Sequence, residues 1–442
     1  MSSNNFNKIN NVFYYKNNGA RIYQKNKLLN NRKKFDINEP NYIKKNNFTS
    51  FNSLNIKKTF NVFASCNIGN ELVLKKELEK IYKNFSNIFI EIGGCSLLSD
   101  WTGIQLANLY SRIATKIFIK IKTAEINKEN DIRELAYHTK WEDWFEHTNS
   151  IRIDTTGHAS IIKNLEYCNL LVKDGLCDRL RKIKGVRPDV DKKNPKIRIF
   201  LFLNKNIATL YIDSSGEPLF KRGWRFAKID APIKENLASG FLAMSYSNQN
   251  IILDPFCGSG TIAIEAAQSL LNIPPGILRS FGFENLIYHD NYNWKIIKEE
   301  AYSNILQKTD KIIFASDINP KAIDICNENA ERALVKKNIK FICQDANQIN
   351  NKYLCSNGLL ITNIPYGYRM HIDKYENIND KIWLKNWSTK LKNQFPLWKL
   401  SILSDDNYLP KYLGMIPNEK IQVYNGKISC NIFIFKIFNN NR

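Results

Sequence analysis

The chain has 442 residues, of which 43% are hydrophobic, and a formal net charge of +22 at pH 7. This length allows two or three domains, each with its own hydrophobic core. The charge favours a polyanionic partner, nucleic acid before an anionic membrane surface, and no apolar run is long enough for a membrane span, so we expect no membrane partner. The nine cysteines form no Cys-x-x-Cys pair and the five histidines no ligand-spaced cluster, so neither a disulfide framework nor a metal site is expected.

Residues 1–59 are dominated by Asn and Lys and carry about half of the excess positive charge, which predicts a disordered basic extension. A basic, acid-poor amino terminus is compatible with an organellar transit peptide, but the stretch is poor in Ala and Ser and shows no amphipathic helix. We therefore expect a cytoplasmic protein, with import into an organelle through this extension as the alternative.

Residues 60–125 alternate between strand and helix patterns. Strand-like runs at 60–66, 88–92 and 116–121 enclose helical spacing at 72–82 and 97–109. A β-α-β-α-β order of this size suits a small ferredoxin-like module. The module carries no catalytic constellation.

A second α+β module is expected over residues 126–216. It has a strand at 151–154, a helix through 170–183, and a hairpin of strands 197–203 and 207–212. The helix carries the cations Lys173, Arg179, Arg181 and Lys182, which could contact phosphates with salt-dependent affinity. A solvated helix face explains the same charges equally well.

Residues 217–442 contain a strand, a glycine-bearing turn and a helix, in the order typical of a small-molecule site. Thr261 follows Gly260 directly, where a P-loop would require Lys, so a nucleoside triphosphate is excluded. The permissive dinucleotide pattern, Gly258 to Ala263, stays open. S-adenosylmethionine binders use a similar turn introduced by an acid, a place that Asp254 occupies, and a tight turn without a ligand is the third reading.

Two further acids stand at the ends of later strands. Asp317 follows the strand-like run 311–315, where a carboxylate can accept both ribose hydroxyls of a nucleoside. Asp345 follows the run 340–343 and could accept a hydrogen bond from an adenine amine. Each acid alone could be a helix cap, but acids after three strands favour S-adenosylmethionine as the cofactor.

The motif Asn363-Ile364-Pro365-Tyr366 follows the apolar strand-like run 359–362. The side-chain oxygen of Asn363 and the backbone carbonyl of Ile364 can accept both hydrogens of an amine on a planar ring, which aims the nitrogen lone pair at a methyl donor. Tyr366 can stack on the base. The alternative is a turn that only ends a strand.

These two motifs, residues 254–267 and Asn363 to Arg369, resemble the THUMP-containing RNA guanine-N2 methyltransferases, above all the amino-terminal half of the bacterial 23S ribosomal RNA enzymes of that group. Other stretches support the resemblance from about Phe60 almost to the carboxyl terminus: Phe63-Ala-Ser, Arg187-Pro-Asp-Val-Asp191, Arg222-Gly-Trp-Arg225, Ala231-Pro-Ile-Lys-Glu235, Tyr424-Asn-Gly426 and Cys430.

The resemblance implies an α/β fold: a Rossmann-like S-adenosylmethionine-dependent methyltransferase domain at 217–442, preceded by a ferredoxin-like module and a THUMP domain that recognise RNA. Asp254, Gly258 and Gly260 would shape the cofactor pocket, with Asp317 on the ribose and Asp345 on the adenine. The Asn363–Tyr366 motif would hold the guanine. Ile364 departs from the commoner Pro, which should be tolerated because that position offers its backbone carbonyl.

The implied reaction is methyl transfer to the exocyclic N2 of a guanine in ribosomal RNA, without a metal or a covalent intermediate. The bacterial enzymes carry a second methyltransferase domain for which this chain has no room, so we expect that activity to be absent. A tRNA guanine-N2 methyltransferase is the nearest alternative, and an inactive RNA-binding ribosome assembly factor is another. The Asn-Ile-Pro-Tyr motif alone would also fit methylation of DNA adenine or protein glutamine. The sequence indicates no particular oligomeric state.

Overall fold

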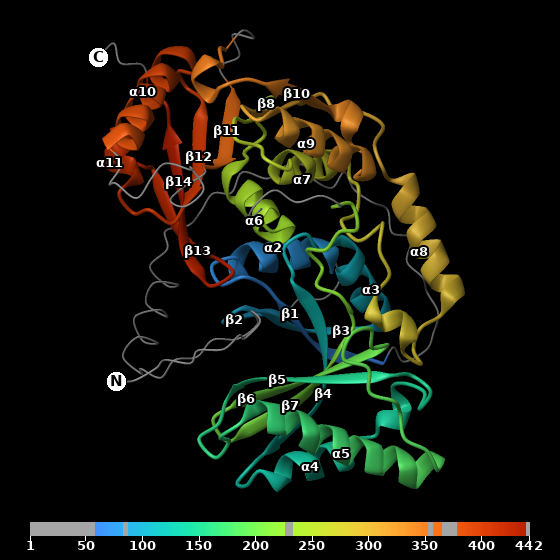
Figure 1. The fold of residues 1–442 in the computed structure, drawn as a ribbon. Coiled ribbons are helices and arrows are strands. Elements are labelled where there is room, and N and C mark those ends of the chain that lie inside the picture. Colours follow the sequence, from blue (N-terminus) through green and yellow to red (C-terminus); the bar gives the residue numbers. More distant parts are fainter. Residues whose placement is uncertain (1–57, 83–86, 226–232, 352–356, 365–377, 439–442) are drawn as a thin grey trace.

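The computed structural model describes residues 58–82, 87–225, 233–351, 357–364 and 378–438. Their strands form two seven-stranded sheets, one in each half of the chain (Figure 1). Apart from its last two positions, the predicted extension over residues 1–59 lies outside the described residues.

The first half begins with a ferredoxin-like unit in which β1 lies between β3 and β4, antiparallel to both. Its elements are β1 (Phe60–Ser65), α2 (Glu71–Ile81), β2 (Ile88–Glu91), β3 (Gly94–Ser99), α3 (Trp101–Tyr110) and β4 (Lys116–Glu125). The predicted module type is confirmed by this fold, with one strand more than the sequence indicated.

The prediction of a helix over 97–109 is wrong at its beginning. Leu97 lies in β3, which forms a hairpin with β2 through a two-residue turn whose Gly93 has a φ of 79°. Helix α3 begins only at Trp101, because the Asp100 side chain accepts a hydrogen bond from the Gly103 N–H at 2.7 Å and so caps the helix there.

The predicted THUMP unit follows, with elements α4 (Asn130–Tyr137), β5 (Ile151–His158), α5 (Leu165–Lys184), β6 (Ile197–Asn204) and β7 (Ile207–Asp213). The predicted hairpin of β6 and β7 is present. The predicted helix extends further at both ends, because Asn164 caps its first turn and Gly185, with a φ of 78°, ends it.

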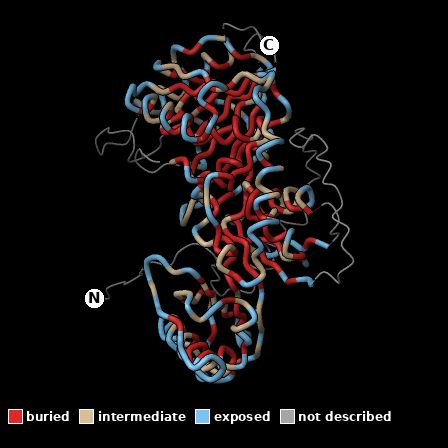
Figure 2. Tube along the Cα trace, turned by 90° about the vertical axis from the view of Figure 1, so that its right-hand side faces the viewer, coloured by how far each residue is buried: buried red, intermediate tan, exposed pale blue. Residues whose placement is uncertain are grey.

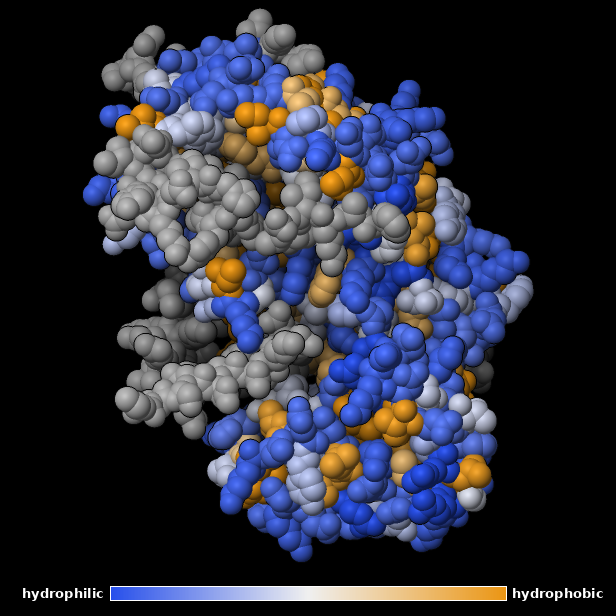
Figure 3. Space-filling model, in the orientation of Figure 1, coloured by the Kyte–Doolittle hydropathy of each residue, from blue (hydrophilic) through white to orange (hydrophobic). Residues whose placement is uncertain are grey.

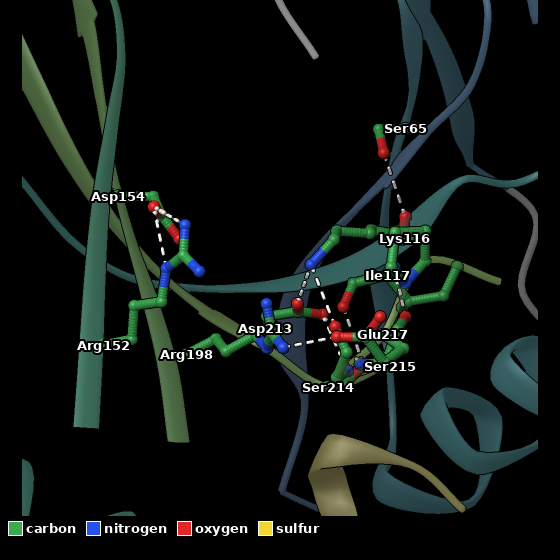
Figure 4. Close-up of polar contacts among 12 residues, drawn as sticks. Ser65, Lys116, Ile117, Arg152, Asp154, Arg198, Asp213, Ser214, Ser215 and Glu217 are labelled. Carbon is green, nitrogen blue, oxygen red and sulfur yellow. Dashed lines mark hydrogen bonds and ion pairs between the residues drawn. The ribbon is translucent and has the colours of Figure 1, made fainter. Parts of the chain in front are cut away.

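The two units share one sheet, because β4 pairs with β7 in the order β2-β3-β1-β4-β7-β6-β5. A buried polar cluster fastens this seam (Figure 4). Lys116 of β4 contacts the Asp213 carboxylate at the end of β7. Next to it, Ile117 donates its N–H to the Ser215 hydroxyl at 2.8 Å and accepts a bond from the Ser214 hydroxyl at 2.7 Å.

The second half has the Rossmann-like order β10-β9-β8-β11-β12-β14-β13. The five strands from β10 to β12 are parallel, and β14 runs antiparallel to both of its neighbours. The strands are β8 (Ile251–Asp254), β9 (Ile312–Asp317), β10 (Ile339–Cys343), β11 (Gly358–Asn363), β12 (Lys399–Ser404), β13 (Glu419–Asn425) and β14 (Ile428–Lys436). The helices are α6 (Glu235–Ser245), α7 (Thr261–Leu270), α8 (Asn291–Ser303), α9 (Pro320–Arg332), α10 (Ile378–Gln394) and α11 (Leu409–Leu413).

This order confirms the predicted fold class. The strand sequence reverses at β8, which lies between β9 and β11, and ligands of open α/β sheets bind at such a switch point, beyond the carboxyl ends of the strands.

Buried residues run through the interior of both halves (Figure 2). On the face seen in Figure 3 the described surface is mainly hydrophilic, with scattered hydrophobic residues. No helix among the described residues has the length and apolar character needed to cross a membrane.

Candidate active site at the carboxyl edge of the second sheet

The second sheet brings four of the predicted site residues to one edge. Asp254, Asp317 and Asn363 are the last residues of β8, β9 and β11, and Asp345 lies two residues beyond β10. These strands are parallel neighbours, so their carboxyl ends meet. The predicted convergence of three acids and one amide is therefore present in the fold.

Asp254, the last residue of β8, is buried and contacts β11. Its Oδ1 accepts hydrogen bonds from the Thr362 hydroxyl at 2.8 Å and from the Phe256 N–H at 3.2 Å. Burial raises the pKa of Asp254 to about 7, against the opposite effect of these two hydrogen bonds. Thr362 precedes Asn363, so the contact ties the glycine-turn strand to the strand that carries the amide.

The two glycines of the turn have different surroundings. Gly258 has a φ of +52°, and a Cβ placed on it would meet no atom of the described residues within 4 Å. Gly260 has a φ of +86°, and a Cβ there would lie 2.3 Å from the Cys326 sulfur of α9. Gly260 is also the N-cap of α7. Because glycine has no side chain, this position leaves the N–H groups of the first helical turn without a capping side chain from the N-cap residue. The turn thus packs against α9 at Gly260 and has open space at Gly258.

Asp317 and Asp345 both accept backbone hydrogen bonds. Asp317 accepts the Gly258 N–H at 2.9 Å and the Asn319 N–H at 3.0 Å, which connects β9 to the glycine turn. Asp345 accepts the Asn347 N–H at 2.7 Å and caps the short helix Ala346–Gln348. Asp345 therefore has the capping role that was the alternative to adenine binding, and its contact with adenine stays a prediction.

Asn363 has a buried side-chain oxygen, Oδ1, with no hydrogen-bond partner among the described residues. Buried acceptors almost always have a partner, so an unpaired one at a sheet edge indicates a position for a donor from a ligand. The next residue, Ile364, is buried. Pro365 and Tyr366 lie outside the described residues, so their predicted roles are not tested.

Sequence reasoning missed several residues of this edge. Arg225 reaches the glycine turn from the segment before α6. Phe256 packs edge-on against Trp383 and Trp387 of α10, with ring centroids 5.8 and 5.6 Å away. Neither contact has a local sequence signal, because each joins residues far apart in the chain. Across the described residues, no three His, Cys, Asp or Glu side chains gather in a group that could hold a metal ion.

Fold and site together define a Rossmann-like methyltransferase domain behind two α+β units. Comparison with family models agrees: residues 61–118 match the RlmL ferredoxin-like domain, 127–213 the THUMP domain, and 222–434 the RMKL-like methyltransferase domain. The three matches follow one another along the chain, so it combines a ferredoxin-like domain, a THUMP domain and an RMKL-like methyltransferase domain. The predicted resemblance is confirmed, while the boundaries at 59, 125 and 216 stay predictions.

Curated relatives are similar along most of this chain. The ribosomal RNA large subunit methyltransferase K/L of Psychromonas ingrahamii is 34% identical over 334 residues, which are 74% of this chain and 44% of the relative. The protein of the same name from Buchnera aphidicola subsp. Acyrthosiphon pisum is 34% identical over 386 residues, 85% of this chain and 54% of the relative. The chain spans about half the length of these relatives.

Solved structures share the whole arrangement. SMU.472, crystallised with SAH, superposes with a TM-score of 0.77 at 25% identity, covering 88% of this chain and 100% of that one. A possible methylase from Clostridium difficile 630 superposes with a TM-score of 0.75 at 27% identity, covering 87% of this chain and 100% of its own.

Proposed function

We propose that this chain transfers a methyl group from S-adenosylmethionine to the exocyclic N2 of a guanine in RNA, with large-subunit ribosomal RNA as the substrate. The observation that carries the proposal is the buried Oδ1 of Asn363, which has no hydrogen-bond partner in the described part of the chain and lies at the sheet edge that also holds Asp254 and the glycine turn. The names of the curated relatives and the SAH bound to SMU.472 support it.

The residues of the edge fit the cofactor. Among the described residues, open space at Gly258 allows close approach to the backbone, and the N-cap residue of α7, Gly260, offers no side-chain hydrogen bond to the first turn. Asp317 can offer carboxylate oxygens to ribose hydroxyls, and Asp345 is our candidate for the adenine amine. S-adenosylmethionine supplies an electrophilic methyl group when it is bound there.

The contribution of the protein is then mainly positioning. Asn363 Oδ1 and the Ile364 carbonyl would accept the two hydrogens of the guanine amine, which favours a pyramidal nitrogen with its lone pair directed at the methyl carbon. The nitrogen–carbon bond would form as the carbon–sulfur bond breaks, S-adenosylhomocysteine would leave, and the methylated amine would release its extra proton to solvent. Tyr366 is assigned to base stacking by its place in the motif alone.

Replacement of Asn363 by Ala tests this proposal. Because the acceptor acts on the reacting amine, we expect methyl transfer to fall at least about a hundredfold, while binding of S-adenosylhomocysteine changes little. Mass spectrometry of N2-methylguanosine in RNA and calorimetric titration with S-adenosylhomocysteine measure the two effects. The control is Asn291→Ala, which removes an exposed amide at the start of α8. Undiminished methylation by Asn363→Ala would contradict the mechanism.

The alternatives give different results in the same assays. Separate analysis of ribosomal and transfer RNA from a deletion strain shows which class loses N2-methylguanosine, so a loss confined to transfer RNA would replace the ribosomal substrate. If the wild-type chain binds RNA but not S-adenosylhomocysteine, the chain is an RNA-binding assembly factor and the enzymatic proposal fails.

A further inference from the structure

Arg225 lies ten residues before α6, and each of its three guanidinium nitrogens donates one hydrogen bond to a different side chain. Its Nε donates to Glu235 Oε1 at 2.6 Å, Nη1 to the Ser259 hydroxyl at 2.9 Å, and Nη2 to the Thr261 hydroxyl at 2.7 Å. Ser259 and Thr261 are the residues on either side of Gly260. One rigid side chain therefore joins the two flanks of the glycine turn.

This placement is electrostatically unfavourable unless something compensates for it. The side chain of Arg225 is only 11% exposed, and a cation near the amino terminus of α7 faces the positive end of the helix dipole. The nearly buried carboxylate of Glu235, in the first turn of α6, supplies the compensating charge. Because the guanidinium is planar with donors in a fixed fork, it holds both hydroxyl oxygens at a set separation.

Helix α9 holds the turn from its other side. The Asn329 side chain donates to the Ser259 carbonyl at 3.1 Å, and the Cys326 sulfur occupies the space next to Gly260. Gly258 has open space instead. The turn is thus fixed by Arg225 on one side and by α9 on another, and is left accessible where the proposed cofactor binds.

We propose that Arg225 is a positioning residue that preorganises the glycine turn for the methyl donor, acting through Ser259 and Thr261 without contacting the donor. The inference rests on the proposed function of this site. A turn that already has its binding conformation loses less entropy when the ligand binds, so Arg225 contributes to affinity for the cofactor. Because Arg225 belongs to the segment between β7 and α6, the affinity for the cofactor also depends on the position of this segment.

The test compares Arg225→Met and Arg225→Lys with the wild-type full-length chain, using S-adenosylhomocysteine as the probe. We expect Arg225→Met to raise its Kd about tenfold, which corresponds to roughly 1.4 kcal/mol. Arg225→Lys keeps the charge beside Glu235 but cannot bridge both hydroxyls, so it should recover only part of the loss. In methylation assays KM for S-adenosylmethionine should rise by a similar factor, with a smaller change in kcat and no change in affinity for RNA.

A mutant cycle distinguishes positioning from general destabilisation. The Ser259→Ala/Thr261→Ala pair should lose cofactor affinity, and Arg225→Met should add little to that loss, because it acts through the same two hydroxyls. The matched control is Arg279→Met. Arg279 is another partly buried arginine, but it donates to backbone carbonyls of Ser215, Pro218 and other residues in the segment after β7. This control should lower Tm and leave the Kd for S-adenosylhomocysteine unchanged.

Each outcome bears on one proposal. If the wild-type chain binds S-adenosylhomocysteine and folded Arg225→Met binds it equally well, or if Arg279→Met loses as much affinity, the positioning role is wrong. The same holds if the losses in the cycle are additive. If Arg225→Met does not fold, the Ser259→Ala/Thr261→Ala pair decides, since unchanged affinity there overturns the inference. No binding by the wild-type chain refutes the proposed function instead.

Discussion

Asp254 shows how burial changes the chemistry of a residue that the sequence correctly places at the edge of the sheet. In an unfolded chain its carboxyl has a pKa near 3.8, whereas burial raises the pKa in the folded protein to about 7. Between these values the folded state holds a proton that the unfolded state has released. Folding stability must therefore fall as pH rises through this interval.

The variant Asp254→Asn tests this linkage. Asn keeps a side-chain oxygen for Thr362 and Phe256 but does not titrate, so it removes the contribution of this group to the pH dependence. Relative to the variant, we expect the wild-type chain to lose roughly 3 kcal/mol of unfolding free energy from pH 4 to pH 7. Urea unfolding at several pH values measures both slopes, and parallel slopes would contradict the raised pKa.

The sequence predicts which residues form the site better than it predicts their protonation and their hydrogen-bond partners. Asp254 and Asn363 could be placed because a residue directly after a buried strand lies at the edge of the sheet. The protonation of Asp254 could not be predicted, because it depends on burial against β11 and on Thr362, 108 residues away. The same is true of Arg225, whose partners Ser259 and Thr261 follow it by 34 and 36 residues.

The glycine turn makes a prediction at the scale of one element, because its two glycines have different surroundings. Gly258→Ala introduces only the strain of a positive φ, about 1 kcal/mol, since a Cβ meets open space. Gly260→Ala adds a collision with the Cys326 sulfur. We expect Gly260→Ala to lower the free energy of unfolding clearly more, whereas Gly258→Ala should fold and lose affinity for S-adenosylhomocysteine.

Urea unfolding and calorimetric titration distinguish these two effects. The control is the Gly260→Ala/Cys326→Ala double variant, in which the collision is relieved and part of the stability should return. Equal destabilisation by the two single variants, or undiminished cofactor affinity in Gly258→Ala, would show that the turn does not have the open and packed sides described above.

Element prediction failed at β3 for a physical reason. Leu97, Leu98 and Leu109 have apolar spacing compatible with a helix, but the Gly93 turn pairs Leu97 with Ile88 in a hairpin. Asp100 then sets the beginning of α3. Both signals are present in the sequence, a glycine pair and an Asp three residues before Gly103, and they indicate the boundary better than the apolar periodicity does.

At the scale of the whole molecule, the two halves are joined by contacts that no local pattern reveals. The insertion after α7 returns to the first half, where Gly276 donates its N–H to the Leu109 carbonyl at 3.0 Å and Ile287 to the Trp144 carbonyl at 2.9 Å. Pairing of β4 with β7 likewise joins residues about 90 apart in the chain. Domain types could be predicted from the sequence, but these joints depend on long-range pairing, which periodicity does not specify.

Glu265 of α7 is buried at the centre of another contact between the two halves. Its carboxylate lies 3.2 Å from Arg222 Nε and 3.5 Å from Arg112 Nη1, and it accepts a hydrogen bond from the Ser239 hydroxyl. Arg112 belongs to the ferredoxin-like unit, whereas Arg222 lies in the segment before α6. Burial alone would raise the pKa of Glu265, but the two guanidiniums outweigh burial and hold it below its ordinary value. The ionised carboxylate thus attracts both cations and connects the two halves.

Glu265→Gln should therefore destabilise the whole molecule and uncouple its halves. The substitution keeps the shape but removes the carboxylate partner of the buried Arg222 guanidinium and takes one carboxylate away from Arg112, a loss of about 3–5 kcal/mol. We expect a calorimetric melt with a lower Tm, and separate transitions for the two halves if the wild-type chain melts in one.

In the wild-type chain the contribution of this carboxylate should disappear as pH falls through its folded pKa, because that pKa is depressed. The exposed pair of Lys295 and Glu299 gives the control, since Glu299→Gln should change stability by less than about 0.5 kcal/mol. An equal effect of the two substitutions would show that the buried network does not hold the halves together.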